Sequence, residues 1–138
     1  MEFISAEEIL KQPKEVQEVF FKWANDNGQD YDLVQDNGEV MLYKDFIERA
    51  RIEFDSYPLF TEGQLRKFIE DKKGLLDIEV QGNGKMFLYQ YSINCFKSSD
   101  EGLFCGDSTH FEIESDNPLQ AYWKVACEIA KESVEGGL

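Results

Sequence analysis

Apolar residues recur at helical spacing in three segments of the chain. These segments follow Pro13, Thr61 and the Asn117-Pro118 pair. Residues three and four positions apart lie on one face of a helix, so each segment predicts a helix with one apolar face. The apolar positions of the three segments are Val16, Val19, Phe20 and Trp23; Leu65, Phe68 and Ile69; and Leu119, Tyr122, Trp123, Ala126, Ile129 and Ala130.

Residues with strong preferences for helix ends mark where these helices start and stop. A Ser or Thr followed three positions later by Glu or Gln forms a capping box, and proline is favoured in the first helical turn. Glycine is favoured just after the last turn. The expected starts are Ser5 with Glu8, Pro13, Thr61 with Gln64, and Asn117-Pro118, and the expected ends are residues 25–28, Gly74 and Gly136-Gly137.

Alternation of apolar and polar residues predicts strands in other parts of the chain. In the longest alternating run, Tyr91, Ile93 and Cys95 share one face while the polar residues between them share the other. Asn37-Gly38 is a hairpin-turn signal between two short runs, and residues 81–84 form a second turn signal. The expected strands are residues 31–35, 39–43, 76–80, 85–96, 103–105 and 111–114.

Residues 45–54 fit two patterns. Phe46, Ile47 and Phe54 suit a helix, whereas residues 49–54 alternate as a strand does, and we favour the helix. Pro58 is expected to break the chain after this segment.

These elements together predict an α+β fold, with an antiparallel sheet of four to six strands and two or three helices packed on one face. The chain has 138 residues and contains no repeat or low-complexity linker, so we expect a single domain over residues 1–138.

The net charge of the chain argues against some classes of binding partner. The chain carries 28 acidic and 14 basic residues, a formal net charge of −14. Binding to nucleic acid or to anionic membranes requires clustered Lys and Arg, so neither is expected. The beginning of the sequence lacks the pattern of a signal peptide, and no apolar run approaches the roughly 20 residues that cross a bilayer. We therefore expect a cytoplasmic protein with reduced cysteines.

Groups for catalysis or metal binding are few. Cys105, Asp107 and His110 are the residue types of a nucleophilic triad, but such triads are normally assembled from distant segments. A zinc site made of Cys95, Cys105 and His110 would lack a fourth ligand and the usual spacing. The aspartates at 26, 30, 32 and 36 do not match the register of a calcium loop. We predict no enzyme activity, no metal and no cofactor.

Two stretches of sequence carry a resemblance to a known group of proteins. They are residues 58–72 (PLFTEGQLRKFIEDK) and residues 119–127 (LQAYWKVAC), and the helix containing Phe21-Lys22-Trp23 adds to them. Together they resemble an uncharacterised family of short acidic proteins from phages and prophages of Gram-positive bacteria. The resemblance implies a phage origin and action in the host cytosol, supplies no catalytic residue, and leaves residues 28–57 as a variable segment.

The charge and the resemblance favour a small phage-encoded accessory protein that acts by binding. The hypothesis is an acidic inhibitor of a host protein, such as a defence factor, whose basic surface would be occupied by carboxylates of the variable segment. The expected contact residues are Asp30, Asp32, Asp36, Glu39, Asp45 and Glu48.

Two other functions stay open. A nucleotide-binding protein, or sponge, would place Arg66, Lys67 and Lys73 on phosphate and stack Tyr89 or Tyr91 on a base. The same cations also have an ordinary explanation, because basic residues near the end of a helix interact favourably with its dipole. The third function is a virion or assembly accessory protein, and the oligomeric state is open.

Overall fold

The computed structural model describes residues 2–27, 32–36, 39–42, 56–82, 89–96 and 108–135. The described helices are α1 (Ala6–Leu10), α2 (Lys14–Asp26), α4 (Glu62–Lys73) and α5 (Pro118–Glu135). The described strands are β1 (Leu33–Asp36), β2 (Glu39–Leu42), β3 (Ser56–Leu59), β4 (Leu75–Gly82), β5 (Tyr89–Phe96) and β6 (Ser108–Ser115).

The helices begin and end where the local sequence favours it. Ser5 accepts a hydrogen bond from the Glu8 amide at the start of α1. Thr61 and Gln64 form the complete capping box of α4, and Gly74 ends that helix with a φ of 98°. Asn117 caps α5 by accepting from the Gln120 amide at 2.9 Å. Pro13 lies one position earlier than predicted, as the N-cap of α2.

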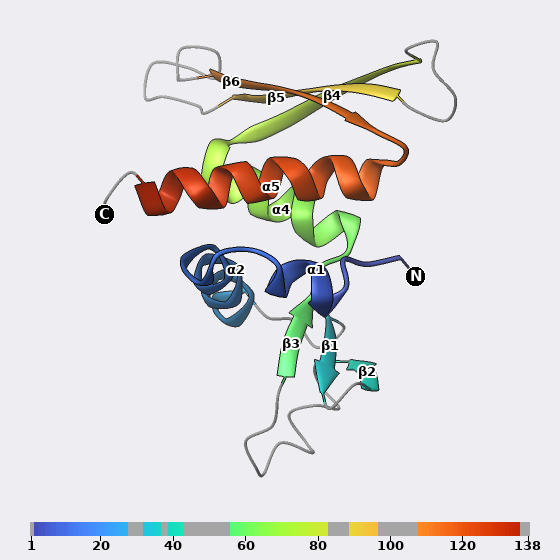
Figure 1. Ribbon diagram of the computed structural model, residues 1–138. Coiled ribbons are helices and arrows are strands. Elements are labelled where there is room, and N and C mark those ends of the chain that lie inside the picture. The colour runs from blue at the N-terminus through green and yellow to red at the C-terminus, as the bar shows by residue number, and fades with distance from the viewer. Residues whose placement is uncertain are drawn as a thin grey trace.

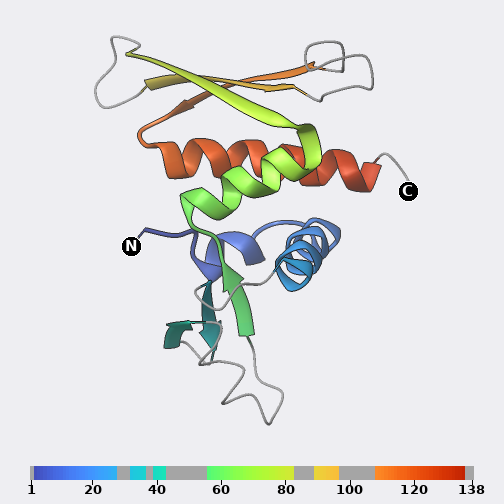
Figure 2. The same cartoon turned by 180° about the vertical axis from the view of Figure 1, so that it is seen from behind.

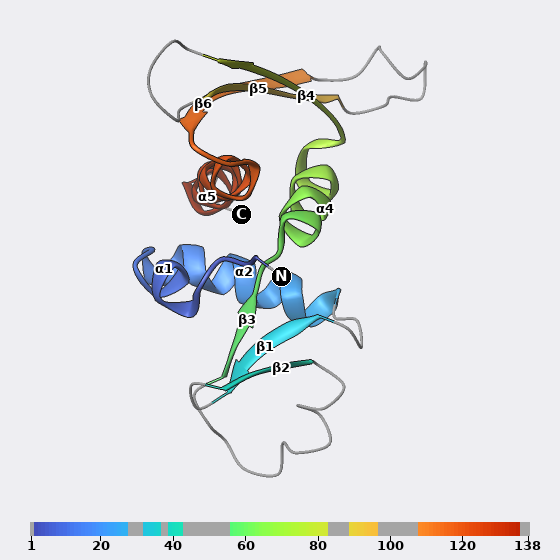
Figure 3. The ribbon, with the colours of Figure 1, turned by 90° about the vertical axis from the view of Figure 1, so that its right-hand side faces the viewer.

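The strands form two separate antiparallel sheets, ordered β2-β1-β3 and β4-β5-β6. The helices lie between them, with α4 and α5 beneath the larger sheet and α1 and α2 nearer the smaller one (Figures 1 and 3). The α+β class is confirmed. The prediction of one sheet with two or three helices on one face is wrong, because six strands in two sheets accompany four helices in the described ranges.

The path of the chain explains why the sheets are separate. β3 ends at Leu59, and α4 then carries the chain through the helical layer before β4 begins. Twelve helical residues rise about 18 Å, so the strands on either side of α4 reach opposite ends of the molecule. The short β1 therefore pairs with β2 and β3, while β5 pairs with the other two eight-residue strands, β4 and β6.

Pro58 also differs from its prediction. It lies within β3, paired with Val34 of β1, and does not break the chain. β3 is at the edge of its sheet, where the missing amide hydrogen of proline need not pair with another strand. The predicted helix at residues 45–54, the strand at 103–105 and the second half of the turn at 81–84 lie outside the described residues, while Gln81 and Gly82 of that turn end β4.

The core fills the helical layer and the inner face of the larger sheet. Phe20 of α2 is fully buried among Phe60, Phe68 and Trp123, with ring centroids 5.0–5.5 Å apart. The Trp23 indole donates to the Asp71 carboxylate at 3.0 Å and so links α2 to α4. The apolar face predicted for α5 is buried as expected.

Candidate functional site

Only three of the six residues predicted to contact a partner lie in the described ranges. Asp36 ends β1 and is the cross-strand partner of Glu39, the first residue of β2. Asp32 is half-buried just before β1, and Glu39 is exposed. Asp30, Asp45 and Glu48 lie outside the described residues. The described members of this set therefore belong to one hairpin, at the end of the molecule away from the larger sheet (Figure 1).

The predicted anion site is not assembled. Arg66 Nε lies 3.5 Å from Glu70 Oε1 on the same helix. Lys73 Nζ lies 2.9 Å from Glu132 Oε2 of α5. Arg66 and Lys73 are separated by about 10 Å of helical rise, and Lys67 is exposed elsewhere on α4. Arg66 and Lys73 thus face their own glutamates and do not converge on one point.

The sheet separates the histidine from the nearest described cysteine. Asn94 and His110 are cross-strand partners, and His110 Nδ1 lies 2.5 Å from Asn94 Oδ1. Cys95, one position further along β5, points to the opposite face and is fully buried, because side chains alternate along a strand. Cys95 and His110 therefore cannot share a zinc ion. Cys105 and Asp107 lie outside the described residues, and no three potential ligands gather elsewhere in the described ranges.

Burial makes both described thiols, Cys95 and Cys127, weaker acids than an exposed cysteine. Loss of water around the thiolate raises the pKa of Cys95 from an ordinary value of 9.0 to about 11, and the pKa of Cys127 from 9.0 to about 12. Each folded pKa lies above the unfolded one. The contribution of each protonated thiol to the free energy of unfolding is fully present below pH 9, and it is lost as the pH rises toward and through the pKa of the folded state.

We expect stability to fall between pH 9 and 11 by up to about 1.4 kcal/mol per pH unit for each thiol. Urea unfolding at pH 8, 9 and 10 would measure this for wild type and Cys127→Ala. The stability difference between the two proteins should shift in favour of the variant as the pH rises. A difference that stays constant over this range would contradict the prediction for Cys127.

The outer face of the larger sheet points away from the helices (Figures 1 and 3) and carries a group of acidic residues. We call this surface the outer sheet face. Antiparallel pairing aligns its residues in three rows across β4, β5 and β6. The rows are Asp77, Asn94 and His110; Glu79, Ser92 and Glu112; and Gln81, Gln90 and Glu114.

Four carboxylates in these rows flank the neutral side chains of the central strand β5. The same rows hold no Lys or Arg, and His110 Nε2 lies 3.4 Å from Glu112 Oε1. All four acidic residues are exposed. The arrangement can offer carboxylates at fixed spacing, with amide and hydroxyl groups between them for hydrogen bonds.

Sequence reasoning identified the polar face of β5 but missed the flanking acids. The signal was present, because Asp77 and Glu79 alternate with Leu76, Ile78 and Val80 in the sequence. Glu112 and Glu114 alternate with Phe111 and Ile113 in the same way. Only the pairing of β4 and β6 with β5 brings the two alternating segments onto one surface.

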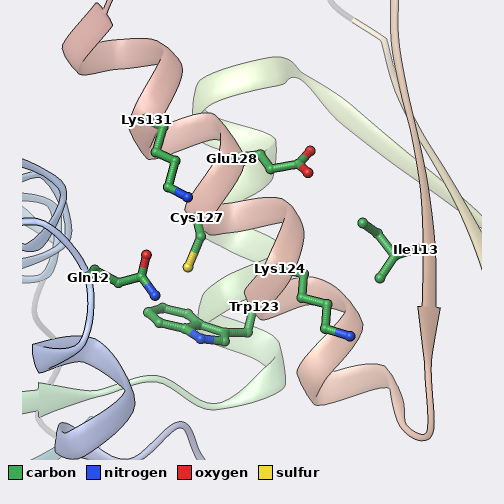
Figure 4. Close-up of a pocket in the computed structure, with 7 residues that line it drawn as sticks. All are labelled: Gln12, Ile113, Trp123, Lys124, Cys127, Glu128 and Lys131. Atoms are coloured by element: carbon green, nitrogen blue, oxygen red, sulfur yellow. The ribbon is translucent and has the colours of Figure 1, made fainter.

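A pocket of about 280 Å³ lies along α5, between the α1–α2 junction and β6. Figure 4 shows Trp123 and Cys127 pointing toward Gln12, while Lys124 and Glu128 lie nearer Ile113. The volume is slightly below the roughly 300 Å³ of typical small-molecule sites. The Lys124 ammonium already donates to the Glu114 carbonyl at 3.0 Å, and Glu128 partly offsets the positive charge. The lining therefore selects no class of ligand.

No protein-family model matches this chain, and no curated protein sequence or solved structure is significantly similar to it. The resemblance to the phage family accordingly stays a prediction. None of the helices in the described ranges has the length and apolarity that crossing a bilayer requires.

Proposed function

We propose that this protein acts by binding the basic surface of another protein, and that the outer sheet face provides the contacts. The observation that carries the proposal is the set of four exposed carboxylates on β4 and β6, in rows without Lys or Arg. Acids two positions apart on one strand lie about 7 Å from each other, and β4 and β6 lie about 10 Å apart. A rigid sheet therefore holds the charges in a fixed pattern before the partner arrives.

The charge of the whole molecule supports the same role. A net charge of −14 creates a negative field that accelerates encounters with basic partners and disfavours acidic ones. The polar side chains of Gln90, Ser92 and Asn94 lie between the carboxylates and add hydrogen-bonding groups. The resemblance to phage proteins suggests a host protein as the partner, with inhibition as the result of binding.

The test is affinity capture from cells in which the protein is produced, followed by identification of what co-purifies. We expect wild type to recover a protein with a basic surface. Neutralising the outer sheet face should lower its recovery at least about tenfold, because close charge pairs contribute strongly to such interfaces. This variant combines Asp77→Asn, Glu79→Gln, Glu112→Gln and Glu114→Gln.

Two further variants locate the contact. The matched control removes four exposed carboxylates from helices, through Glu7→Gln, Glu15→Gln, Glu18→Gln and Glu135→Gln. It should retain most of the recovery, because it alters net charge equally but leaves the outer sheet face intact. The hairpin variant combines Asp32→Asn, Asp36→Asn and Glu39→Gln. Full recovery by the outer-face variant, or loss only in the hairpin variant, would overturn the assignment of contacts to the outer sheet face.

A further inference from the structure

β4 is a long edge strand whose two faces differ in chemistry. It pairs with β5 on one side, and no other described strand pairs with its free side. Asp77 and Glu79 project onto the outer sheet face, while Leu76, Ile78 and Val80 form an inward-facing apolar row. Figure 2 shows β4 along the near edge of the sheet, with no drawn helix or strand beyond it.

The two edges of this sheet are covered unequally on the inner face. On β6, Phe111 is 7% and Ile113 9% exposed, because α5 packs beneath that strand. On β4, Leu76 and Ile78 are only partly buried and Val80 is 51% exposed. Tyr89 of β5, the cross-strand partner of Gly82, is also 44% exposed. The apolar row of β4 is therefore incompletely buried. A strand added at this edge would place its own inward side chains beside this row and bury more of it.

The acidic row determines which strand fits. Side chains directly opposite each other on paired strands lie about 5 Å apart, so an added strand would place its outward residues beside Asp77 and Glu79. A second copy of β4 would set carboxylates against carboxylates, which is destabilising. A strand with Lys or Arg on that face would be attracted.

We infer that β4 binds an extended segment of a partner by strand addition, and that this segment alternates basic and aliphatic residues. Its backbone would pair with the free edge, its aliphatic side chains would contact Ile78 and Val80, and its cations would face Asp77 and Glu79. This inference rests on the proposed function and gives its partner a defined form. Charged residues also protect edge strands from aggregation, and the experiment below separates that role from docking.

The probe is an end-capped heptapeptide in which lysine and valine alternate. Titration into isotope-labelled protein, followed by amide chemical shifts, should give the largest changes in β4 (Leu75–Gly82). A second peptide of nearly equal composition has proline in place of its central valine and cannot complete a strand. We expect it to bind at least about tenfold more weakly, because strand addition depends on main-chain hydrogen bonds.

Matched variants separate pairing from general charge attraction. The variant Asp77→Lys with Glu79→Lys should weaken binding of the lysine–valine peptide at least about tenfold. The control Glu112→Lys with Glu114→Lys makes the same charge change at the other edge and should weaken binding much less. Val80→Thr keeps strand preference but removes apolar contact, and a loss of about threefold is expected.

Three results would overturn strand addition at β4. The first is equal binding of the proline peptide and the lysine–valine peptide. The second is an equal loss of peptide binding in the two double-lysine variants. Either result is explained by charge attraction alone and leaves the proposed function unaffected. The third is absence of binding by wild type, which removes strand addition while the capture experiment still tests the proposed function independently. A concentration-dependent dimer that pairs through β4 would replace the partner segment by a second copy, and would also overturn the inference.

Discussion

Replacing Phe20 by alanine is expected to lower the free energy of unfolding by about 3–5 kcal/mol. Phe20 is fully buried, and its ring contacts those of Phe60, Phe68 and Trp123. These partners belong to the β3–α4 junction, α4 and α5, so one side chain joins most of the helical layer. Its removal loses both the transfer free energy of the ring and the contacts of the surrounding groups, which cannot collapse fully into the space.

Phe21→Ala is the matched control on the same helix. Phe21 is only partly buried, and its described ring contact is with Tyr57 at 6.1 Å. We expect a loss of about 1 kcal/mol, in proportion to the smaller apolar area removed from water. Urea unfolding followed by tryptophan fluorescence would compare the two variants. Similar losses in both would show that the aromatic cluster is not centred on Phe20.

Ile93→Ala is expected to cost about 2–5 kcal/mol. Ile93 is fully buried at the middle of β5, with Ile78 and Phe111 as its cross-strand neighbours. It packs the centre of the larger sheet against the helices, and truncation leaves a cavity on the inner face of the sheet. This residue therefore tests whether the inner face of the sheet is a core surface.

Ser92→Ala changes the adjacent residue, which points to the outer sheet face. A substitution there should alter stability by no more than about 0.5 kcal/mol, because the side chain is not part of the buried core. Thermal and urea unfolding would measure both variants. A large effect of Ser92→Ala, or a negligible one of Ile93→Ala, would reverse the assignment of the two faces.

The ends of the helices could be predicted from sequence because they depend on neighbouring residues. Thr61 and Gln64 satisfy each other's backbone groups within one turn, and Gly74 tolerates the positive φ that ends α4. The inward face of β5 was equally accessible, since Tyr91, Ile93 and Cys95 alternate with polar residues. Such features need no information about distant parts of the chain.

The division into two sheets depended on distant contacts and was missed. The Asn37-Gly38 turn signals a hairpin but does not indicate which third strand the hairpin joins. Pro58 suggested a break because its place at an edge is known only once the strand order is known. For the candidate site, the same reason applies: the acids of β4 and β6 are 33 or more positions apart in sequence and meet only across β5.

The alternating rows of β5 also bear on how such a protein can diverge. Residues that build the core and residues that face outward occupy adjacent positions, yet they belong to opposite surfaces. Mutations at Gln90, Ser92 or Asn94 can therefore accumulate with little effect on folding. A lineage under pressure to recognise a changing target could revise one side of this sheet repeatedly while the other side keeps the architecture constant.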